Sequence, residues 1–340
     1  MKILAIDTSC DETACAVTAG TKVLSNIVWS QASLHAKFGG VMPSLAQRQH
    51  REHIGFVVDQ ATKISKLKIK NLDAIAVTIG PGLSIALGVG ISKAKELAKK
   101  YNKPLIPINH VEAHLLSPFA NFKFHPFPAL GLVLSGGTTQ LILIEQIGKY
   151  KILAETQDDA LGEALDKAAR MLGLGYPGGA ILEKFAKNSN PKTYPLPVPL
   201  IDDKVKNRFS YSGLKTAFIR LVEKEKPLTK QKIYDLAASF QNTAFEHILR
   251  VLSYQVNHQS LTINHLLLGG GVANNIEIRN KLRKLCKEKG LKLHIPYSKK
   301  LCCDNAAMIG ICAYLKTKDL KLNTFTDCSQ IDREPRLKLV

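Results

Sequence analysis

Residues 3–18 read ILAIDTSCDETACAVT, and residues 130–144 read LGLVLSGGTTQLILI. Each stretch consists of an apolar run, a turn of small and hydroxyl-bearing residues, and a second apolar run, which is the pattern of two strands joined by a short connection. The pattern stands once in each half of the chain. The sequence therefore contains an internal repeat of a strand–turn–strand unit.

Other short apolar runs alternate with longer amphipathic segments. Runs of strand length occupy residues 2–7, 14–19, 74–78, 130–135, 140–146 and 265–270. Segments with helical periodicity occupy residues 45–66, 84–100, 110–118, 160–173, 230–257 and 274–289. Strands that alternate with helices are typical of an α/β fold. Residues 187–212 are rich in proline and polar residues, and we expect them to form an ordered surface excursion.

A third glycine-containing turn follows the last of these strands, where residues 269–275 read GGGVANN and a helix follows. Glycines let the backbone approach a ligand, and a helix N-terminus offers N–H groups to a phosphate. Three ordinary glycine turns are the alternative. The two strand–turn–strand units resemble the pair of phosphate-facing loops in the duplicated actin, Hsp70 and sugar-kinase fold, and that resemblance implies a nucleotide in a cleft between two halves.

Length and composition indicate a globular protein with two domains. The chain has 340 residues, of which 45% are apolar and 22% charged, so it can bury two cores. No apolar run reaches the roughly 18 residues of a membrane span, and Asp7 comes too early for a signal-peptide apolar region. Seven cysteines at irregular spacing argue against a disulfide framework. We therefore expect a cytoplasmic protein with reduced cysteines.

The net charge favours a polyanionic partner. Lys and Arg number 47 against 28 Asp and Glu, which gives a formal charge of +19. Neutralising phosphates releases bound counterions, so such an excess favours nucleic acid binding. A general enrichment of the proteome in lysine is the alternative explanation.

The stretch NHVEAH, residues 109–114, carries two histidines at helical spacing. Asn109 can cap a helix, with Glu112 completing a capping box, and His110 and His114 then lie one turn apart on one face, where two imidazoles can share a metal. A zinc protease also needs Glu directly after the first His, and residue 111 is Val. The protease interpretation therefore lacks its base, while two histidines without a metal remain an alternative.

Ten blocks, in order, together resemble the TsaD family. They are DTSCDET (7–13), GGVMPSLAQRQH (39–50), GPGLSIALGVGISKAKELA (80–98), NHVEAH (109–114), LSGGTTQL (134–141), DDALGEALDKAARMLGLGYPGG (158–179), FSYSGLKTA (209–217), SFQ (239–241), GGGVANN (269–275) and CCDNAAMIG (302–310). Members of this family were formerly described as sialoglycoproteases. They transfer a threonylcarbamoyl group from threonylcarbamoyl-AMP to N6 of adenosine 37, just 3′ of the anticodon, in tRNAs that read ANN codons, and release AMP.

The resemblance implies a duplicated actin/Hsp70/sugar-kinase-like α/β fold with nucleotide and metal in the interlobe cleft. We expect a first lobe at residues 1–117 plus about 305–325, a second lobe at 118–304, and a loosely ordered tail at 326–340. The resemblance also implies one Fe²⁺, or Zn²⁺, held by His110, His114 and Asp304, because two imidazoles and one carboxylate leave coordination positions open.

The resemblance assigns the adenylate contacts to residues of the second half. They are Leu134, Ser135, Gly136, Gly137, Thr138, Asp166, Gly179 and Asn275. Asp166 can accept the ribose hydroxyls, and the Asn275 amide can both donate to and accept from the adenine edge. An acid within a helical pattern is otherwise more often a solvated residue, which is the alternative for Asp166.

Asp11 and Glu12 are the carboxylates that the resemblance places near the reacting amine, where a base must remove a proton. Acids at a helix or turn N-terminus are the structural alternative for this pair. The chain departs from the family pattern at five positions. They are Asp7 for Glu, Ser44 for Glu, Thr138 for His, Asn274 for Ala, and Cys303 for Thr beside Asp304. Cys302 and Cys303 are adjacent, so both thiolates are not expected to reach one metal.

The resemblance implies tRNA as substrate and three partner proteins: a TsaB-like paralogue, a TsaE-like ATPase, and a TsaC-like enzyme that makes the donor. Three rival interpretations make different predictions. A metalloprotease needs a water-activating acid beside the histidines. A sugar kinase or Hsp70-like ATPase shares the fold but has no use for two histidines facing Asp304. A non-enzymatic tRNA-binding subunit would not turn over the donor.

Overall fold

The structure is a computed structural model that describes residues 1–122, 126–187, 189–203, 207–259, 261–318 and 328–340. The chain divides into two compact units, unit 1 with Met1–His125 and Ile295–Val340, and unit 2 with Pro126–His294. The expected boundaries at 117/118 and 304/305 therefore move to 125/126 and 294/295. The first boundary lies later than expected because the short helix η3 (Ser117–Phe119) directly follows helix α4 (His110–Leu116) and packs against helix α10 (Ala306–Thr317) of unit 1.

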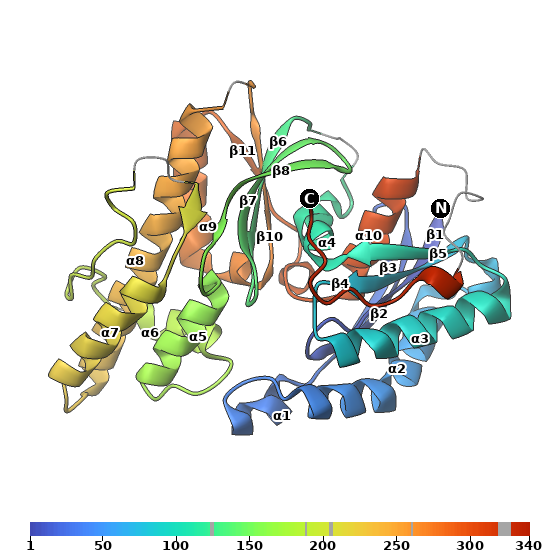
Figure 1. Ribbon diagram of the computed structural model, residues 1–340, viewed down its shortest axis with the longest axis horizontal. Helices are drawn as coiled ribbons and strands as arrows, with labels where there is room; N and C mark the ends of the chain where they lie inside the picture. The colour runs from blue at the N-terminus through green and yellow to red at the C-terminus, as the bar shows by residue number, and fades with distance from the viewer. Residues whose placement is uncertain (123–125, 188, 204–206, 260, 319–327) are drawn as a thin grey trace. The chain divides into compact units, whose positions relative to one another are not determined.

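Unit 1 is built on a five-stranded mixed sheet with strand order β3-β2-β1-β4-β5 (Figure 1). Its strands are β1 (Lys2–Asp7), β2 (Glu12–Ala19), β3 (Lys22–Ser30), β4 (Ala74–Gly80) and β5 (Leu105–Asn109). β1 to β3 form an antiparallel meander, β4 pairs with β1 in parallel, and β5 pairs with β4 in parallel. Its helices are α1 (Ala32–His35), α2 (Pro43–Ser65), α3 (Ser84–Tyr101), α4 (His110–Leu116) and α10 (Ala306–Thr317).

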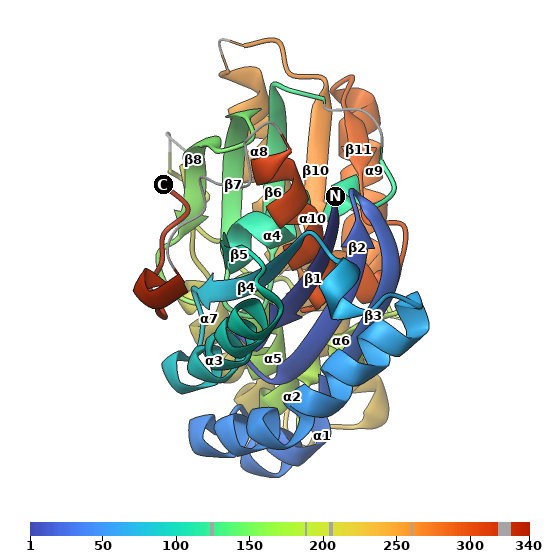
Figure 2. The same cartoon turned by 90° about the vertical axis from the view of Figure 1, so that its right-hand side faces the viewer.

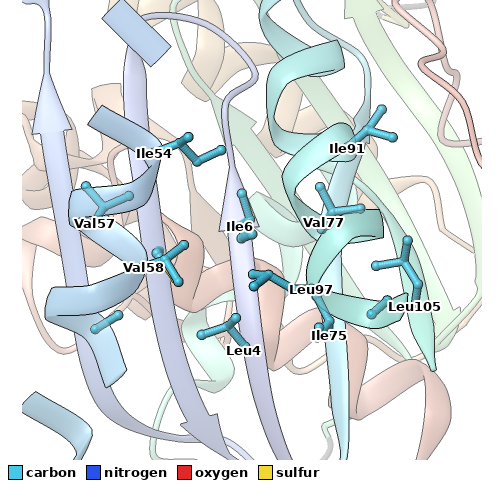
Figure 3. Close-up of a cluster of buried hydrophobic side chains, with 14 of the residues drawn as sticks. Leu4, Ile6, Ile54, Val57, Val58, Ile75, Val77, Ile91, Leu97 and Leu105 are labelled. Atoms are coloured by element: carbon cyan, nitrogen blue, oxygen red, sulfur yellow. The ribbon is translucent and has the colours of Figure 1, made fainter. Parts of the chain in front are cut away.

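Helices α2 and α3 pack together against one face of this sheet, as Figure 2 shows. Alternate residues of β1 point to opposite faces, so Leu4 and Ile6 enter the core beneath α2 and α3. Ile54 and Leu97 meet them from α2 and α3 (Figure 3). Each fully buried side chain of this size stabilises the fold by about 1.5–3 kcal/mol relative to an exposed one.

Helix α10 packs against β1 and β2 and approaches the sheet closely at Gly310. A Cβ atom at this position would lie 2.7 Å from Thr18 Oγ1 and 3.3 Å from Ala5 Cβ. Glycine is therefore needed for the helix to sit this near the strands. Because α10 also packs on α4, it ties the helix with the two histidines to the sheet.

Unit 2 repeats the arrangement of unit 1. Its sheet has the order β11-β10-β6-β7-β8-β9, in which β6 to β8 form an antiparallel meander and β10 and β11 add to β6 in parallel. Its strands are β6 (Ala129–Leu134), β7 (Thr139–Gln146), β8 (Lys149–Thr156), β9 (Arg208–Phe209), β10 (His265–Gly269) and β11 (Lys292–His294). Its helices are α5 (Leu161–Met171), α6 (Gly178–Ala186), α7 (Ser212–Lys224), α8 (Lys230–Asn257) and α9 (Ile276–Glu288). The duplicated α/β fold expected from the two hairpins is confirmed.

We expected residues 326–340 to form a loose tail. Residues 326 and 327 lie outside the described residues, but residues 328–340 pack on unit 1, where Ile331 is buried with 4% of its surface exposed. The expectation is wrong for this segment because its backbone hydrogen-bonds to Ile79 and Gly82 at the end of β4. In the described part of the chain, no helix combines the length and apolar character needed to cross a membrane.

Candidate metal centre and donor-binding loops

Helix α4 begins directly after β5, and Asn109 caps it. The Asn109 Oδ1 atom accepts hydrogen bonds from the amides of Val111, at 2.8 Å, and Glu112, at 3.2 Å. These amides lack helical partners, so the cap fixes the first turn that carries His110. The Glu112 Oε2 atom accepts from Lys316 Nζ of α10 at 2.6 Å, so this ion pair links α4 to α10.

His110, His114 and Asp304 come together in unit 1. Each offers one ligand atom, and these three atoms lie within 4.8 Å of one another. His114 Nε2 lies 2.9 Å from Asp304 Oδ1, and His110 Nε2 lies 3.6 Å from the same oxygen. The histidines come from α4, while Asp304 follows the short helix η5 (Lys299–Leu301) and precedes Asn305, which caps α10.

This donor set fits a divalent transition metal. Two imidazole nitrogens and a carboxylate oxygen are ligands that iron and zinc accept, and three protein ligands leave positions open. The Nδ1 atoms of His110 and His114 are buried and make no hydrogen bond within the described residues. The cluster therefore contains two buried polar atoms whose hydrogen-bonding potential is not satisfied by the described part of the chain. Buried polar atoms without partners are costly in stable folds, and a bound ligand would relieve such a cost.

Charges around the cluster shift the pKa values of its members. Burial lowers the pKa of His110, but the carboxylates of Asp304 and Asp7 outweigh it and raise this pKa to about 9. Burial raises the pKa of Asp304, yet His110 and His114 hold it well below its usual range. Asp7 at the end of β1 is fully buried, and its Oδ2 lies 3.6 Å from His110 Nδ1. Burial raises the pKa of Asp7. The two carboxylates therefore favour a positive charge at this cluster, either on His110 or on a bound cation.

The connection between β1 and β2 carries Asp11 and Glu12, and buried neighbours fix its shape. Thr8 Oγ1 donates to the Ala86 carbonyl and accepts from the Gly90 amide, which ties the connection to α3. Asp11 is buried with 9% of its surface exposed, and Glu12 is the first residue of β2. Burial and the nearby Asp11 carboxylate raise the pKa of Glu12 well above its usual range, with a further contribution from Asp304.

His50 is a supporting residue that sequence reasoning missed. It lies on α2, is fully buried, and its Nε2 is 3.0 Å from the carbonyl of Cys10 in the β1–β2 connection. Its Nδ1 is 2.8 Å from Thr13 Oγ1. Helical periodicity assigned this residue to a helix, but only the fold brings α2 beneath the loop of Asp11 and Glu12.

In unit 2 the turn between β6 and β7 forms an open glycine loop at residues 135–138. Ser135 Oγ accepts from the Thr138 amide at 2.9 Å, and the Ser135 amide donates to the Thr138 carbonyl at 2.8 Å, which closes the turn. Gly136 and Gly137 are exposed, and among the described residues nothing accepts from their amides. Two exposed glycines on a fixed turn, whose amides have no acceptor in the described part of the chain, are suited to bind an anion.

The ends of two further segments surround this loop. A Cβ atom at Gly162, in the first turn of α5, would lie 2.6 Å from the Ser135 carbonyl oxygen. Gly270 has φ of +91°, and a Cβ there would lie 2.3 Å from the Leu134 carbonyl oxygen. Both glycines are therefore required by close backbone approach. Residues of the second hairpin and of GGGVANN thus lie at one edge of the unit 2 sheet.

Asp166 and Gly179 are joined directly, because Asp166 Oδ1 accepts from the Gly179 amide at 2.7 Å. This bond caps the N-terminal end of α6, which packs against α5. Burial raises the pKa of Asp166, and the amides of Gly179 and Gly178 partly offset that rise. The side chain is half-buried, so the alternative of a simply solvated acid does not describe it.

The Asn275 side chain makes hydrogen bonds within the fold that the sequence did not predict. Its Oδ1 caps α9 by accepting from Glu277 and Ile278, and its Nδ2 donates to Gln241 Oε1 at 2.8 Å. The Oδ1 atom is therefore not available to accept from an adenine edge in this arrangement, which leaves the second N–H of the amide. The Glu183 side chain accepts a hydrogen bond from the Ile276 amide. The first turn of α9 is therefore not the open phosphate site that the sequence predicts.

Comparison with known proteins identifies relatives along almost the whole chain. The family model described as "TsaD: tRNA N6-adenosine threonylcarbamoyltransferase" matches residues 22–311. A protein named tRNA N6-adenosine threonylcarbamoyltransferase from Persephonella marina is 44% identical over 322 residues, which cover 94% of this chain and 91% of the relative. A protein of the same name from Thermosipho africanus is 42% identical over 343 residues, and the match covers both chains completely.

Solved structures share the fold at much lower identity. Full-length HypF matches with a TM-score of 0.61 and 14% identity over 96% of this chain and 47% of that chain. Component A of (R)-2-hydroxyglutaryl-CoA dehydratase from Acidaminococcus fermentans matches with a TM-score of 0.57 and 14% identity, covering 94% of this chain and all of that one. At this identity the likeness concerns the fold alone, and it agrees with a duplicated actin and sugar-kinase type.

Proposed function

Because the chain belongs to the TsaD family of tRNA N6-adenosine threonylcarbamoyltransferases, we propose that the site just described performs threonylcarbamoyl transfer to tRNA. The donor is threonylcarbamoyl-AMP, and the acceptor is N6 of adenosine 37 in tRNAs reading ANN codons. The N6 nitrogen forms a bond to the carbamoyl carbon, the bond from that carbon to the phosphate oxygen breaks, and AMP leaves. The observation that carries the proposal is the match over residues 22–311 to this family.

His110, His114 and Asp304 would hold one divalent metal, Fe²⁺ in our proposal and Zn²⁺ as the alternative. The ligand atoms within 4.8 Å of one another support this assignment. When bound, such a metal supplies Lewis-acid polarisation of a carbonyl or phosphoryl oxygen. Because the metal requires neutral imidazoles, binding would release the proton that Asp304 and Asp7 favour on His110.

Glu12, with Asp11 beside it, would accept the proton that leaves the N6 amine. A general base works best when its pKa lies near the working pH. Burial and the Asp11 charge raise the pKa of Glu12 in this direction, and the hydrogen bond from Ser30 at 3.2 Å orients the carboxylate. Asp11 would then act by tuning Glu12 or as the base itself, and the variants below separate these roles.

The adenylate part of the donor would bind at the glycine loop of unit 2. The exposed glycines Gly136 and Gly137 offer amides that suit the phosphate, with Leu134, Ser135 and Thr138 shaping the turn. Asp166 keeps one carboxylate oxygen beyond its bond to Gly179, and that oxygen suits a ribose hydroxyl. Asn275 would contribute its remaining N–H. Thr138 replaces the family His, so this chain offers a hydroxyl where relatives offer an imidazole.

The tRNA is the polyanionic substrate that the charge of +19 suits. The target adenosine lies in a single-stranded loop, so presenting its N6 amine costs less than extrusion from a duplex. We further propose that the protein is cytoplasmic and works with a TsaB-like paralogue and a TsaE-like ATPase, with donor from a TsaC-like enzyme. These partners follow from the family and are tested by adding each protein to the assay.

The test is transfer of labelled threonine from threonylcarbamoyl-AMP to an ANN-decoding tRNA transcript. The double variant His110→Ala with His114→Ala is expected to lose transfer, while His258→Ala, an exposed histidine on unit 2, should behave as wild type. A transcript with guanosine at the target position serves as the substrate control. Wild-type protein without transfer, with and without partners, would overturn the proposal in favour of an accessory role.

Asp11→Asn and Glu12→Gln, measured at saturating donor, locate the base. We expect the variant that lacks the catalytic base to transfer at least about 100-fold more slowly, while its binding of donor and tRNA stays normal. If both variants retain transfer, neither carboxylate is the base. The assignment of the chain as a threonylcarbamoyltransferase would still stand.

A further inference from the structure

Residues 328–340 form a segment that we call the strap, and it is anchored on unit 1. It begins with a short helix, η7 (Cys328–Gln330), and is the dark red segment of Figure 1 that ends at the C label. Ile331 enters the core shared by α2, α3 and the sheet. The Glu334 amide donates to the Ile79 carbonyl at 2.7 Å, and the Gly82 amide donates to the Pro335 carbonyl at 3.2 Å.

The end of β4 is shaped to receive the strap. A Cβ atom at Gly80 would lie 1.8 Å from the Glu334 carbonyl oxygen and 3.1 Å from Leu337 Cβ. No side chain fits in that space, so the strap and the strand end are in direct backbone contact. Ligand sites of α/β sheets lie at the carboxyl ends of the strands. The strap therefore runs along the edge of unit 1 from which α4 begins.

The strap also contacts the cap of the histidine helix. Asn109 Nδ2 donates to the Lys338 carbonyl oxygen at 3.0 Å, across 229 residues of sequence. The other end of the same amide, Oδ1, accepts from Val111 and Glu112 in the first turn of α4. The amide is nearly buried, with Asn109 7% exposed. One planar group thus links the strap backbone to the turn that carries His110.

We propose that the strap is a positioning element for the metal centre and acts through Asn109. The Lys338 carbonyl fixes the orientation of the Asn109 amide, and the fixed amide sets the start of α4 and the direction of His110. Groups behind metal ligands orient them, and their loss commonly costs 10–100-fold in metal affinity. The inference rests on the metal site of the proposed function and adds the residues that hold that site in place.

The experiment measures Co²⁺ binding to the full chain by competition with a chromophoric chelator and by visible absorption. Two variants break the link from opposite ends. One ends the chain after Leu337 and removes the Lys338 carbonyl. The other is Asn109→Ser, which keeps an N-cap oxygen and adds no charge but is too short to reach the strap. Lys338→Ala, which leaves the carbonyl in place, is the matched control.

We expect each linking variant to bind Co²⁺ roughly 10-fold more weakly, with altered visible absorption of the bound ion, and Lys338→Ala to match wild type. Since both variants remove the same link, the combined variant should be no weaker than either alone. Thermal unfolding of each apo variant identifies any loss of fold, and Asn109→Ser tests the link even if the shortened chain is unstable.

Wild-type Co²⁺ affinity and spectrum in both linking variants would overturn the strap inference alone. Losses that multiply in the combined variant would also overturn it, because the strap would then act by a separate route. If the wild-type protein does not bind one Co²⁺ per chain, the metal site of the proposed function is overturned, and the strap inference with it.

Discussion

His114 Nε2 lies 2.9 Å from Asp304 Oδ1, although 190 residues separate the two in sequence. The His114 side chain is 1% exposed, whereas the Asp304 side chain is 23% exposed, so the contact has one buried and one partly open partner. The imidazole is fixed by α4, and the carboxylate is fixed between η5 and the Asn305 cap of α10. The two ligands are therefore held near one another by the fold before any metal binds, which lowers the entropic cost of assembling the site.

Asp304→Asn should lower affinity for Fe²⁺ or Zn²⁺ by at least about 100-fold, since it replaces a charged ligand with a weak neutral one. Competition with a chelator of known affinity measures this change. Cys303→Ser is the control, because Cys303 is exposed beside Asp304 and supplies no ligand to the cluster. A comparable loss in Cys303→Ser would show that the thiol contributes to binding after all.

Lys316→Met should destabilise unit 1 by about 3 kcal/mol. The Glu112 side chain is 3% exposed, and the substitution leaves this buried carboxylate without the Lys316 ammonium at 2.6 Å. Urea unfolding measures the change. Lys99→Met, at an exposed position on α3, should alter stability by less than about 0.5 kcal/mol.

Adding Glu112→Gln to Lys316→Met should recover most of the lost stability, because no unpaired charge then remains at this position. A double variant as unstable as the single one would contradict this account. It would indicate that the Lys316 stem, rather than the ion pair, stabilises the packing of α4 on α10.

Unit 2 should lose stability as the pH falls from about 6.5 to about 4. Burial, with repulsion from Arg250, lowers the pKa of His247 from 6.5 to about 4. In this window the unfolded chain takes up a proton that the folded chain does not, so the stabilisation present above 6.5 is lost as the pH approaches the folded value. The full effect, reached near pH 4, is roughly 3 kcal/mol, and part of this stabilisation is already lost at pH 5. Unfolding in urea at pH 7.5 and pH 5 measures it.

His247→Gln should show a smaller pH effect than wild type, since glutamine does not titrate and can still accept from the Ser210 amide. His294, also with a pKa lowered to about 4, should account for part of the remaining effect. His258→Gln, on an exposed position of the same segment, should retain the wild-type pH profile. Equal profiles for His247→Gln and wild type would contradict the assignment.

Gly162→Ala should weaken binding of a non-reactive donor analogue by about tenfold or more. The added methyl group would lie 2.6 Å from the Ser135 carbonyl oxygen, so the glycine loop has to move. Gly213→Ala, where nothing lies within 4 Å of the added carbon, is the matched control and should bind normally. Titration calorimetry distinguishes the two. Unchanged affinity in Gly162→Ala would separate the loop from donor binding.

The hairpin repeat and the NHVEAH spacing were readable from local pattern. Continuous apolar runs located β1, β6 and β7 nearly to the residue, because these strands are buried on both faces. Strands β3, β5, β8, β9 and β11 were missed. β3 and β8 are long but largely exposed or half-buried, so polar residues interrupt their apolar pattern, while β9 and β11 have only two and three residues. Helix α10 was missed because it is apolar on nearly all sides, as a buried helix is.

Residues with structural duties in the site were the hardest to predict. Asn275 stays a predicted adenine contact, but no local pattern indicated that its amide also caps α9 and bonds Gln241. His50 carried no predicted role, although it bonds the loop of Asp11 and Glu12. A side chain's partner depends on which elements the fold brings together, and no local pattern encodes contacts between residues 30 or 40 positions apart.

Local pattern predicted the duplicated α/β fold and the two-histidine helix, and the order of the motifs predicted the family, because apolar runs, helical spacing and motif order are properties of the chain itself. The tertiary structure alone revealed the ion pair of Lys316 with Glu112 and the contact of the strap with Asn109, and it gave the geometry of the His114–Asp304 contact that the resemblance implied. Those contacts join segments about 190 to 229 residues apart, and they form only because packing of α10 and the strap on unit 1 outweighs the entropy of ordering them.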